Sequence, residues 1–522
     1  MNAGTCQARF ELLAENREVY LKRARECSKL TIPTLIPENN HGKHTVFPTP
    51  YQGVGARGVN NLASKLLLSL FPPNSPFFAM RVDDWTAEEI AQEKGQRAKV
   101  DEQLGKYERS VMQSIEDSGD RSAHFEALKH LIVGGNVLLY LPKDGGTRVF
   151  PLSRYVVTRD PMGTLLEAII EEEMAFVSLP EDMRELITEA RQEGEEIDPK
   201  SEVKLYTKFY LEGGKIKSFQ EVAGVKVPDS DGEWPAEKSP VMALRWTRID
   251  GEDYGRSYVE EYLGDLISLE GLSKALLEAA AISARVVFLA NPNGLTRAKD
   301  VNEAETGDTV SGRLEDIDAL QVNKHADMSV AQQQVTTIIE RLAYAFLMNS
   351  AVQRNGERVT AEEVRYMAGE LEDALGGVYS ILSQEYQLPY VMRVIDRLTK
   401  QKKLPSLPKG VAKPTIVTGL EALGRGHDLS KYDLFLKALA PLGPEVIASE
   451  MNVGDYITRI GTSLGIDLDG LIKSDEQKKS EQAAAKADQQ QGQMMDMAGK
   501  AVPAVAKEAA AAIAQGAQEP QG

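Results

Sequence analysis

Two stretches, SYVEEYLGDLISLEGLSKALLEAAAISARV (257–286) and SVAQQQVTTIIERLAYAFLM (329–348), decide the fold class of this chain. Both carry apolar side chains in steps of three and four, the spacing of one face of an α-helix. A helix as long as the first stretch spans about 45 Å. The repeating positions are Val259, Tyr262, Leu266, Leu269, Leu272 and Leu276, then Val335, Ile338, Leu342 and Phe346. The pattern predicts helix, compact insert and helix, with the insert between 287 and 328.

The first half of the chain mixes helices with strands. Helices are predicted over residues 1–30, 60–71 and 87–118, and HFEALKHLIVGGNVLLYLP (124–142) is typical of a helix, a tight Gly-Gly turn and a buried strand. Segment 180–200 is acidic and predicted helical, and FFAMRV (77–82) is predicted as a strand. Alternating apolar and polar residues predict strands within 147–158, 165–176, 203–211, 215–222 and 240–247. The predicted class is α+β, mainly helical.

The chain after residue 348 begins with a polar loop, NSAVQRNGERV (349–359). The capping box formed by Thr360 and Glu363 then starts a helix over 360–388. The pair Gly376-Gly377 costs this helix about 1 kcal/mol per glycine and predicts a kink, and Pro389 predicts a second bend.

The C-terminal part of the chain is less regular. Residues 403–426 are predicted to be extended, and a small helical region runs from Ser430 to about 474. From 476 onward Ala, Gln and Lys dominate with no sustained apolar face, which is typical of a disordered or conditionally helical tail.

Composition limits the kinds of partner. The 522 residues are 42% hydrophobic and 26% charged, with a formal net charge of −18. Surfaces that hold nucleic acid or anionic membrane need an excess of Lys and Arg, so this charge argues against both while still suiting a conduit through which DNA slides. The chain has only two cysteines, Cys6 and Cys27, which excludes a disulfide framework and suits a reducing cytoplasm. With no signal peptide and no spanning helix visible, we expect a soluble protein without a membrane partner.

The motif GVGARG (53–58) matches the glycine pattern that cradles phosphates in dinucleotide sites. Such a site needs a buried strand before the glycines, and Pro48 and Pro50 interrupt the preceding stretch. We therefore interpret the glycines as allowing a turn to pack against its own helix. A nucleotide-binding enzyme built on Gly53–Gly58 is the alternative function.

Residue patterns of catalysis or metal binding are weak in this chain. His41 and His44 have the spacing of a metal pair, but no cysteine or third histidine is near them in the sequence. Neither the G-x-x-x-x-G-K-[ST] phosphate loop nor the G-x-S-x-G nucleophile elbow occurs. We expect no catalytic residue, no metal and no cofactor, and hence no enzyme.

Two segments carry distinctive charge. Between residues 297 and 320, seven acidic side chains face three basic ones, and the loop 349–359 carries Arg354, Asn355 and Arg358. Taken alone, both are typical of solvated surface. The seven acidic residues are Asp300, Glu303, Glu305, Asp308, Glu315, Asp316 and Asp318.

Long stretches of the chain resemble the head–tail connector (portal) proteins of short-tailed phages of the autographivirus type. They are QGVGARGVNNLASKLLLSLFP (52–72), HFEALKHLIVGGNVLLYLP (124–142), DGEDYGRSYVEEYLGDLISLE (250–270), FLMNSAVQRNGERVTAEEVRYMAGELEDALGGVYSILSQE (346–385) and PTIVTGLEALGRGHDL (414–429). Together they span most of residues 9–475 in order. Residues 180–235 and the tail beyond 476 depart from the family pattern.

The resemblance implies the phage portal fold, with wing, stem, clip and crown regions. Residues 1–256 and 360–429 would form the wing, 257–286 and 329–348 the two stem helices, and 287–328 the clip. Loop 349–359 would be the tunnel loop, with Arg354, Asn355 and Arg358 facing DNA in the channel. Residues 430–475 would form the crown and 476–522 the tail. The seven acidic side chains of the clip would face its partners.

The resemblance also implies a function and partners. The chain would form a dodecameric ring with itself at one capsid vertex, nucleate procapsid assembly with scaffolding and major capsid proteins, and pass double-stranded DNA during packaging and ejection. Its clip would bind the large subunit of terminase and then the tail adaptor protein, with internal core proteins as further partners. We expect it in the virion at the head–tail junction, after assembly in the host bacterial cytoplasm.

Overall fold

A computed structural model describes residues 4–38, 44–73, 76–82, 96–143, 145–190, 202–283, 287–320, 325–348, 377–405 and 412–416, with isolated positions at 369–375 and 435–461. The chain divides into two compact units, residues 1–88 with 106–427, and residues 89–105 with 428–522. In the second unit the described residues are the first turns of one helix and the isolated positions between 435 and 461. Apart from residues 96–105, the features below lie in the first unit.

A helix packed on an antiparallel sheet forms the N-terminal core. Helix α1 (Cys6–Lys29) begins at Thr5, whose hydroxyl accepts a hydrogen bond from Ala8 N. The sheet has the order β4–β5–β6–β7–β8, with β9 pairing on β7. Its strands are β4 (Tyr155–Arg159), β5 (Leu165–Ala175), β6 (Glu202–Glu212), β7 (Lys215–Val222), β8 (Val225–Lys226) and β9 (Gly232–Pro235). One buried cluster joins α1 to the sheet through Cys6, Phe10, Leu13, Val156, Ile169 and Tyr206.

A second layer of helices packs on α1 and on a smaller sheet. Helix α5 (Asp120–Gly134) ends at Gly135, whose φ of 69° lets the chain reverse into strand β2 (Asn136–Tyr140). Strand β2 lies between β10 (Val241–Arg245) and β3 (Arg148–Pro151). Helix α2 (Val54–Leu70) packs on α5, helix α4 is Gln96–Asp117, and helix α6 is Glu181–Ala190. The predicted helix, Gly-Gly turn and buried strand at 124–142 is confirmed.

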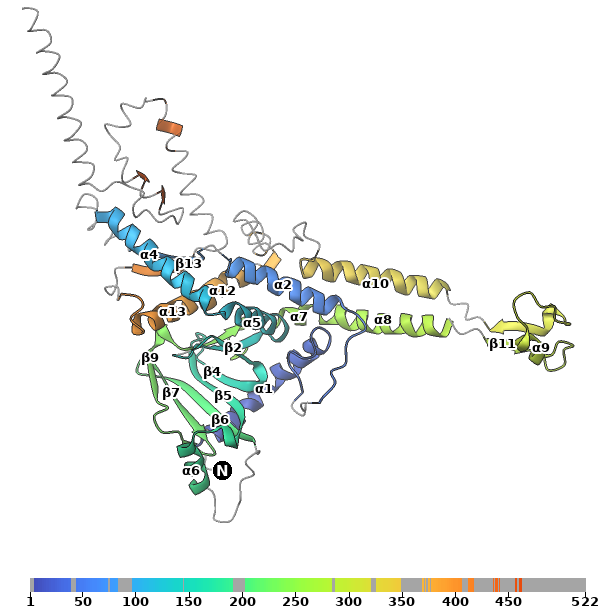
Figure 1. The fold of residues 1–522 in the computed structure, drawn as a ribbon, viewed down its shortest axis with the longest axis horizontal. Helices are drawn as coiled ribbons and strands as arrows, with labels where there is room; N and C mark the ends of the chain where they lie inside the picture. Colours follow the sequence, from blue (N-terminus) through green and yellow to red (C-terminus); the bar gives the residue numbers. More distant parts are fainter. Residues whose placement is uncertain are drawn as a thin grey trace, which may run out of the picture. The chain divides into compact units, whose positions relative to one another are not determined.

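Two helices run side by side away from this core (Figure 1). The short helix α7 (Tyr258–Glu261) leads into α8 (Leu263–Ser283), and α10 (His325–Ala345) packs on α8. Between them in sequence lies a hairpin of β11 (Val287–Ala290) and β12 (Ile317–Leu320), with the short helix α9 (Ala298–Glu303). The predicted order of helix, insert and helix is confirmed. The first helix breaks at Tyr262 and so is shorter than predicted.

The segment after Gly377 departs from its prediction. Helix α12 (Gly377–Leu382) continues through a π-helical turn, Ser383–Gln387, into α13 (Leu388–Lys400). The helix therefore does not end at 388, and Pro389 falls in the first turn of α13, directly after the π-helical turn. The predicted capping box at 360–363 and Gly376 lie outside the described residues.

Strand β1 (Phe78–Val82) finds its partner far along the chain. It pairs antiparallel with β13 (Ala412–Ile416), part of the stretch that was predicted only to be extended. Antiparallel sheets and helices together confirm the predicted α+β class. In the described residues no helix is long and apolar enough to cross a membrane.

Candidate functional site

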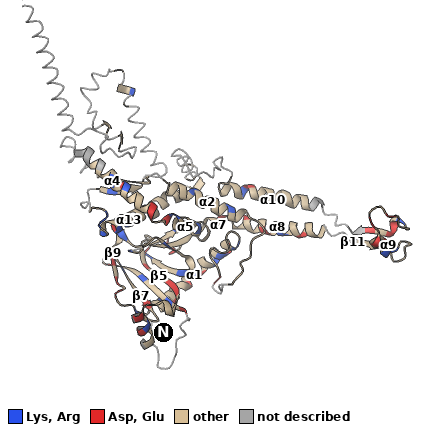
Figure 2. Cartoon of the chain, in the orientation of Figure 1, with Lys and Arg blue, Asp and Glu red and all other residues tan. Residues whose placement is uncertain are grey.

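The helix pair α8 and α10 exposes apolar side chains. Where a surface helix normally confines its apolar side chains to one face, those of α8 beyond Leu269 are spread around the helix, with the exposed pair Lys274 and Glu278 among them. Figure 2 shows few charged residues along either helix. The exposed apolar side chains are Ile267, Leu277 and Ile282 on α8 and Val330 and Tyr344 on α10. Such a surface on one chain is typical of a face that another protein surface covers.

The hairpin between these helices is acidic and also exposes apolar groups. Figure 2 shows acidic residues gathered on it around α9. Six of the seven acidic side chains singled out in the sequence are exposed. Phe288, Leu289, Leu295 and Leu314 are exposed as well, Leu314 to 97%. The hairpin thus combines negative charge with apolar contact area, the two ingredients of a protein-docking surface.

Asp316 differs from the other six acidic residues. It is only 8% exposed, and its Oδ2 accepts hydrogen bonds from Leu295 N (2.9 Å), Thr296 N (3.0 Å) and Thr296 Oγ1 (2.9 Å). Hydrogen bonds from the hydroxyl and amide of Thr296 lower the pKa of this carboxyl. Gly294 lies so close that a Cβ there would be 2.6 Å from Asp316 Cγ. We therefore assign Asp316 to holding the hairpin together rather than to facing a partner.

The glycines of GVGARG serve helix packing. Gly53 precedes the first residue of α2, and Gln52 Oε1 accepts a hydrogen bond from Gly55 N. A Cβ at Gly55 would lie 2.5 Å from Leu30 O, and one at Gly58 would lie 2.6 Å from Phe346 Cγ. Gly55 and Gly58 lie within α2 and let it approach the end of α1 and the end of α10, so the interpretation as a turn packed against its own helix is wrong. Nothing in this geometry supports the nucleotide-binding alternative.

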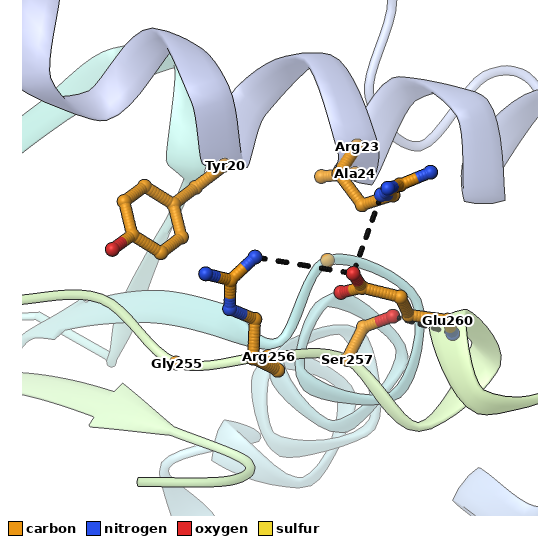
Figure 3. Close-up of a pocket in the computed structure, with 8 residues that line it drawn as sticks. Tyr20, Arg23, Ala24, Gly255, Arg256, Ser257 and Glu260 are labelled. Atoms are coloured by element: carbon orange, nitrogen blue, oxygen red, sulfur yellow. Dashed lines mark hydrogen bonds and ion pairs between the residues drawn. The ribbon is translucent and has the colours of Figure 1, made fainter. Parts of the chain in front are cut away.

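A network of charged side chains at the start of α7 was not predicted from the sequence (Figure 3). It lines a small polar hollow, where Arg23 Nε of α1 lies 3.3 Å and Arg256 Nη1 lies 3.9 Å from Glu260 Oε1. Arg256 also pairs with Glu252 at 2.9 Å. The Arg256 guanidinium also stacks over the Tyr20 ring, at 4.8 Å from its centroid. The hydrogen bond to Glu252 raises the pKa of Arg256.

This network ties α1 to the base of the helix pair. Ser257 Oγ accepts a hydrogen bond from Glu260 N at 2.9 Å and caps α7. The spacing Ser257-x-x-Glu260 is the sequence signal that would have located this helix start.

A buried polar cluster fastens α13 and its π-helical turn to α5. His124 Nδ1 and Tyr386 Oη are hydrogen-bonded at 2.6 Å, and Tyr390 Oη donates to Asp120 Oδ2 at 2.8 Å. The His124 ring stacks on Phe71 with 4.2 Å between centroids. Burial lowers the pKa of His124 to about 4, so the ring is neutral near pH 7. These side chains belong to the buried core. The sequence pattern around His124 does not indicate which residues it contacts.

Arg354, Asn355 and Arg358 of the loop 349–359 lie outside the described residues, as does His41. Among the residues that the structure describes, no group of three or more His, Cys, Asp or Glu side chains forms a metal-binding arrangement.

Comparison of the sequence with known proteins identifies its family. The family described as "Bacteriophage head to tail connecting protein" matches residues 3–472. The portal protein of Escherichia phage T7 is 44% identical over 516 residues, covering 97% of this chain and 92% of its own length. That of Enterobacteria phage T3 is 46% identical over 480 residues, covering 91% and 89%. The chain therefore belongs to the head–tail connector, or portal, proteins of short-tailed phages, which are structural components of the virion at the head–tail junction.

Among solved structures, a chain from "Virion of native gene transfer agent (GTA) particle" covers 79% of this chain and 90% of its own length. Its identity is 10% and the TM-score is 0.35, a similarity too low to add to the sequence match.

Proposed function

We propose that the chain forms a dodecameric ring at one capsid vertex and that this ring is the channel for genome packaging and ejection. In this proposal the ring nucleates procapsid assembly with scaffolding and major capsid proteins. It binds terminase during packaging and the tail adaptor afterwards. Family membership supports the connector role, and the exposed apolar surface of α8 and α10 is the observation that carries the ring.

The argument for the ring is energetic. Leu277 and Ile282 on α8 and Val330 on α10 are more than half exposed in a single chain. Full burial of an exposed side chain of this size contributes about 1.5–3 kcal/mol, so covering each of these contributes about half of that. In a closed ring each chain packs one face against the next chain and a second face against the previous one, so the exposed apolar surface of every copy is covered by a neighbour. An isolated chain leaves all of it in water.

The regions then take the roles of a portal. Helices α8 and α10 form the stem, and the hairpin within 287–328 forms the clip, whose exposed carboxylates and apolar side chains face terminase and later the adaptor. Residues 1–256 and 360–429 form the wing, and 430–475 form the crown. Loop 349–359 faces DNA, where Arg354 and Arg358 give rings of cations.

Charge supports passage rather than binding of DNA. Proteins hold DNA by replacing its condensed counterions with Lys and Arg contacts. A chain with a formal net charge of −18 repeats that negative charge around the ring. Two arginines per chain in one loop then provide a local grip within a channel wall that otherwise repels phosphate.

The ring is tested by the mass of the purified protein. Light scattering should give about twelve times 57.3 kDa, and negative-stain images down the axis should show a central hole. Leu277→Glu, which places a carboxylate in the proposed interface, should reduce the particle to small oligomers. Val177→Glu is the matched control, because Val177 is 58% exposed and Leu277 is 56% exposed. A Leu277→Glu protein that keeps the full mass would show that α8 does not form the interface.

A further inference from the structure

The last residues of α10 adopt a strained ending. Leu347 has a φ of 53°, in the left-handed region that side chains other than glycine and asparagine rarely adopt, which costs roughly 1–2 kcal/mol. Its amide donates to Tyr344 O at 3.1 Å, and Met348 N donates to Ala343 O at 2.8 Å. This geometry usually places glycine after the last helical turn. The residue here is a leucine, although a glycine would avoid the strain.

Side chains from other elements bind the carbonyl groups at this ending. Asn61 Nδ2 of α2 donates to Phe346 O at 2.9 Å and to Leu347 O at 3.0 Å. Lys65 Nζ of α2 donates to Leu347 O at 2.9 Å. Tyr258 Oη donates to Ala345 O at 2.8 Å. Helix C-terminal carbonyls commonly meet water instead.

The lysine in this set is a buried charge. Lys65 is only 6% exposed, and removing an ammonium from water costs several kcal/mol unless strong partners replace the water. The end of a helix is a favourable place for it, because the carbonyl dipoles of α10 point toward the ammonium. A hydrogen bond from a charged donor also restrains its acceptor more strongly than a neutral one.

Helix α2 is seated closely on this ending. Gly58 packs against the Phe346 ring with no room for a Cβ, so α2 and the end of α10 cannot slide apart without opening that contact. Asn61 and Lys65 follow Gly58 at three- and four-residue steps, on the same face of α2. One face of one helix therefore provides both the packing surface and the donors.

We propose that Lys65 and Asn61 are positioning residues that fix the direction in which the chain leaves α10 and enters the segment 349–359. Leu347 has a left-handed backbone, and the side chains of Asn61 and Lys65 both donate to its carbonyl oxygen. Their common effect is to hold Leu347 O in one place. This inference rests on the proposed function, in which the segment that starts two residues later faces DNA.

The test compares heads assembled with portal variants. Lys65→Met keeps the length of the side chain and removes the charge. We expect rings of normal mass whose heads lose packaged DNA faster before tail addition, by about tenfold if retention follows the position of Leu347 O, since one charged hydrogen bond is about a factor of ten in an equilibrium constant. Lys65→Arg, which still donates, should restore retention. Asn61→Ala provides a second variant without a change of charge. Lys22→Met, on the exposed face of α1, is the matched control.

Destabilised and loop variants separate the outcomes. Leu21→Ala, in the core of α1, lowers stability without touching this helix end. Equal DNA loss in Leu21→Ala and Lys65→Met would overturn the inference, because stability alone would then explain it. Unchanged retention with Arg354→Ala and Arg358→Ala together would refute the proposed role of the loop. Faster loss in that double variant with normal retention in Lys65→Met and Asn61→Ala would refute the positioning role alone.

Discussion

Mild acid should destabilise this protein through two buried histidines of α5. His124 is 1% exposed and His130 is 3% exposed, and burial lowers the pKa of each to about 4 from the ordinary 6.5. The nearby Asp120 opposes this shift for His124, and Lys129 adds to it for His130. Neither ring has a partner for both nitrogens, since His124 Nε2 and His130 Nδ1 have none. Protonation would therefore leave a buried charge.

The size of the effect follows from linkage between protonation and folding. Because the folded pKa is lower than the unfolded pKa, the unfolded chain binds more protons between pH 6.5 and pH 4, and stability falls as the pH falls through that window. Between pH 7 and pH 5 each histidine should remove about 2 kcal/mol from the free energy of unfolding. Glu167 and Asp396 have pKa values below their ordinary 4.5 and 3.8, so their contribution to stability is lost at lower pH than the interval from pH 7 to pH 5.

Urea unfolding at pH 7 and at pH 5 measures this loss. Protein concentration is held constant, because assembly shifts apparent stability. His130→Leu should lose about half of the difference between the two pH values, and His124→Phe, which keeps the stack on Phe71, should lose the other half. His44→Ala, at an exposed position, should keep the whole difference. If His130→Leu and His124→Phe both keep the wild-type difference, the two buried rings are not its source.

Three further predictions concern the hairpin and α2. Asp316→Ala should increase hydrogen exchange across the hairpin while the rest of the chain keeps its protection, because three hydrogen bonds end on one carboxylate oxygen. Asp318→Ala, at an exposed position, should leave exchange unchanged, and equal effects of the two variants would contradict the role assigned to Asp316. Gly58→Ala should lower thermal stability by about 1–3 kcal/mol through overpacking, and an unchanged transition would mean that the facing ring moves freely. Glu303→Lys with Glu305→Lys should weaken terminase binding, most at low salt, with ring mass unchanged. Unchanged binding would show that these two carboxylates do not contribute to docking.

Local patterns in the sequence were enough to predict much of the fold. The helices at 263–283 and 325–345, the Gly-Gly turn before β2 and most strands of the large sheet follow from residues that are neighbours in the chain. The family, too, follows from the sequence, because long stretches match in order. The predicted helix end at 388 was wrong, because a π-helical turn precedes Pro389 and the helix continues. Such a turn depends on packing and leaves no period in the sequence.

The roles of individual side chains depended on contacts between distant segments. The sequence alone placed Asp316 with six other acidic residues, and only the fold puts its carboxylate against Thr296 and inside the hairpin. Likewise, GVGARG gives no sign that Gly58 faces Phe346, or that Lys65 reaches Leu347 O. Side-chain period and turn chemistry are properties of a few consecutive residues, so the sequence determines them. Burial and hydrogen-bond partners belong to pairs of residues far apart in the chain, and only the tertiary structure decides which of them meet.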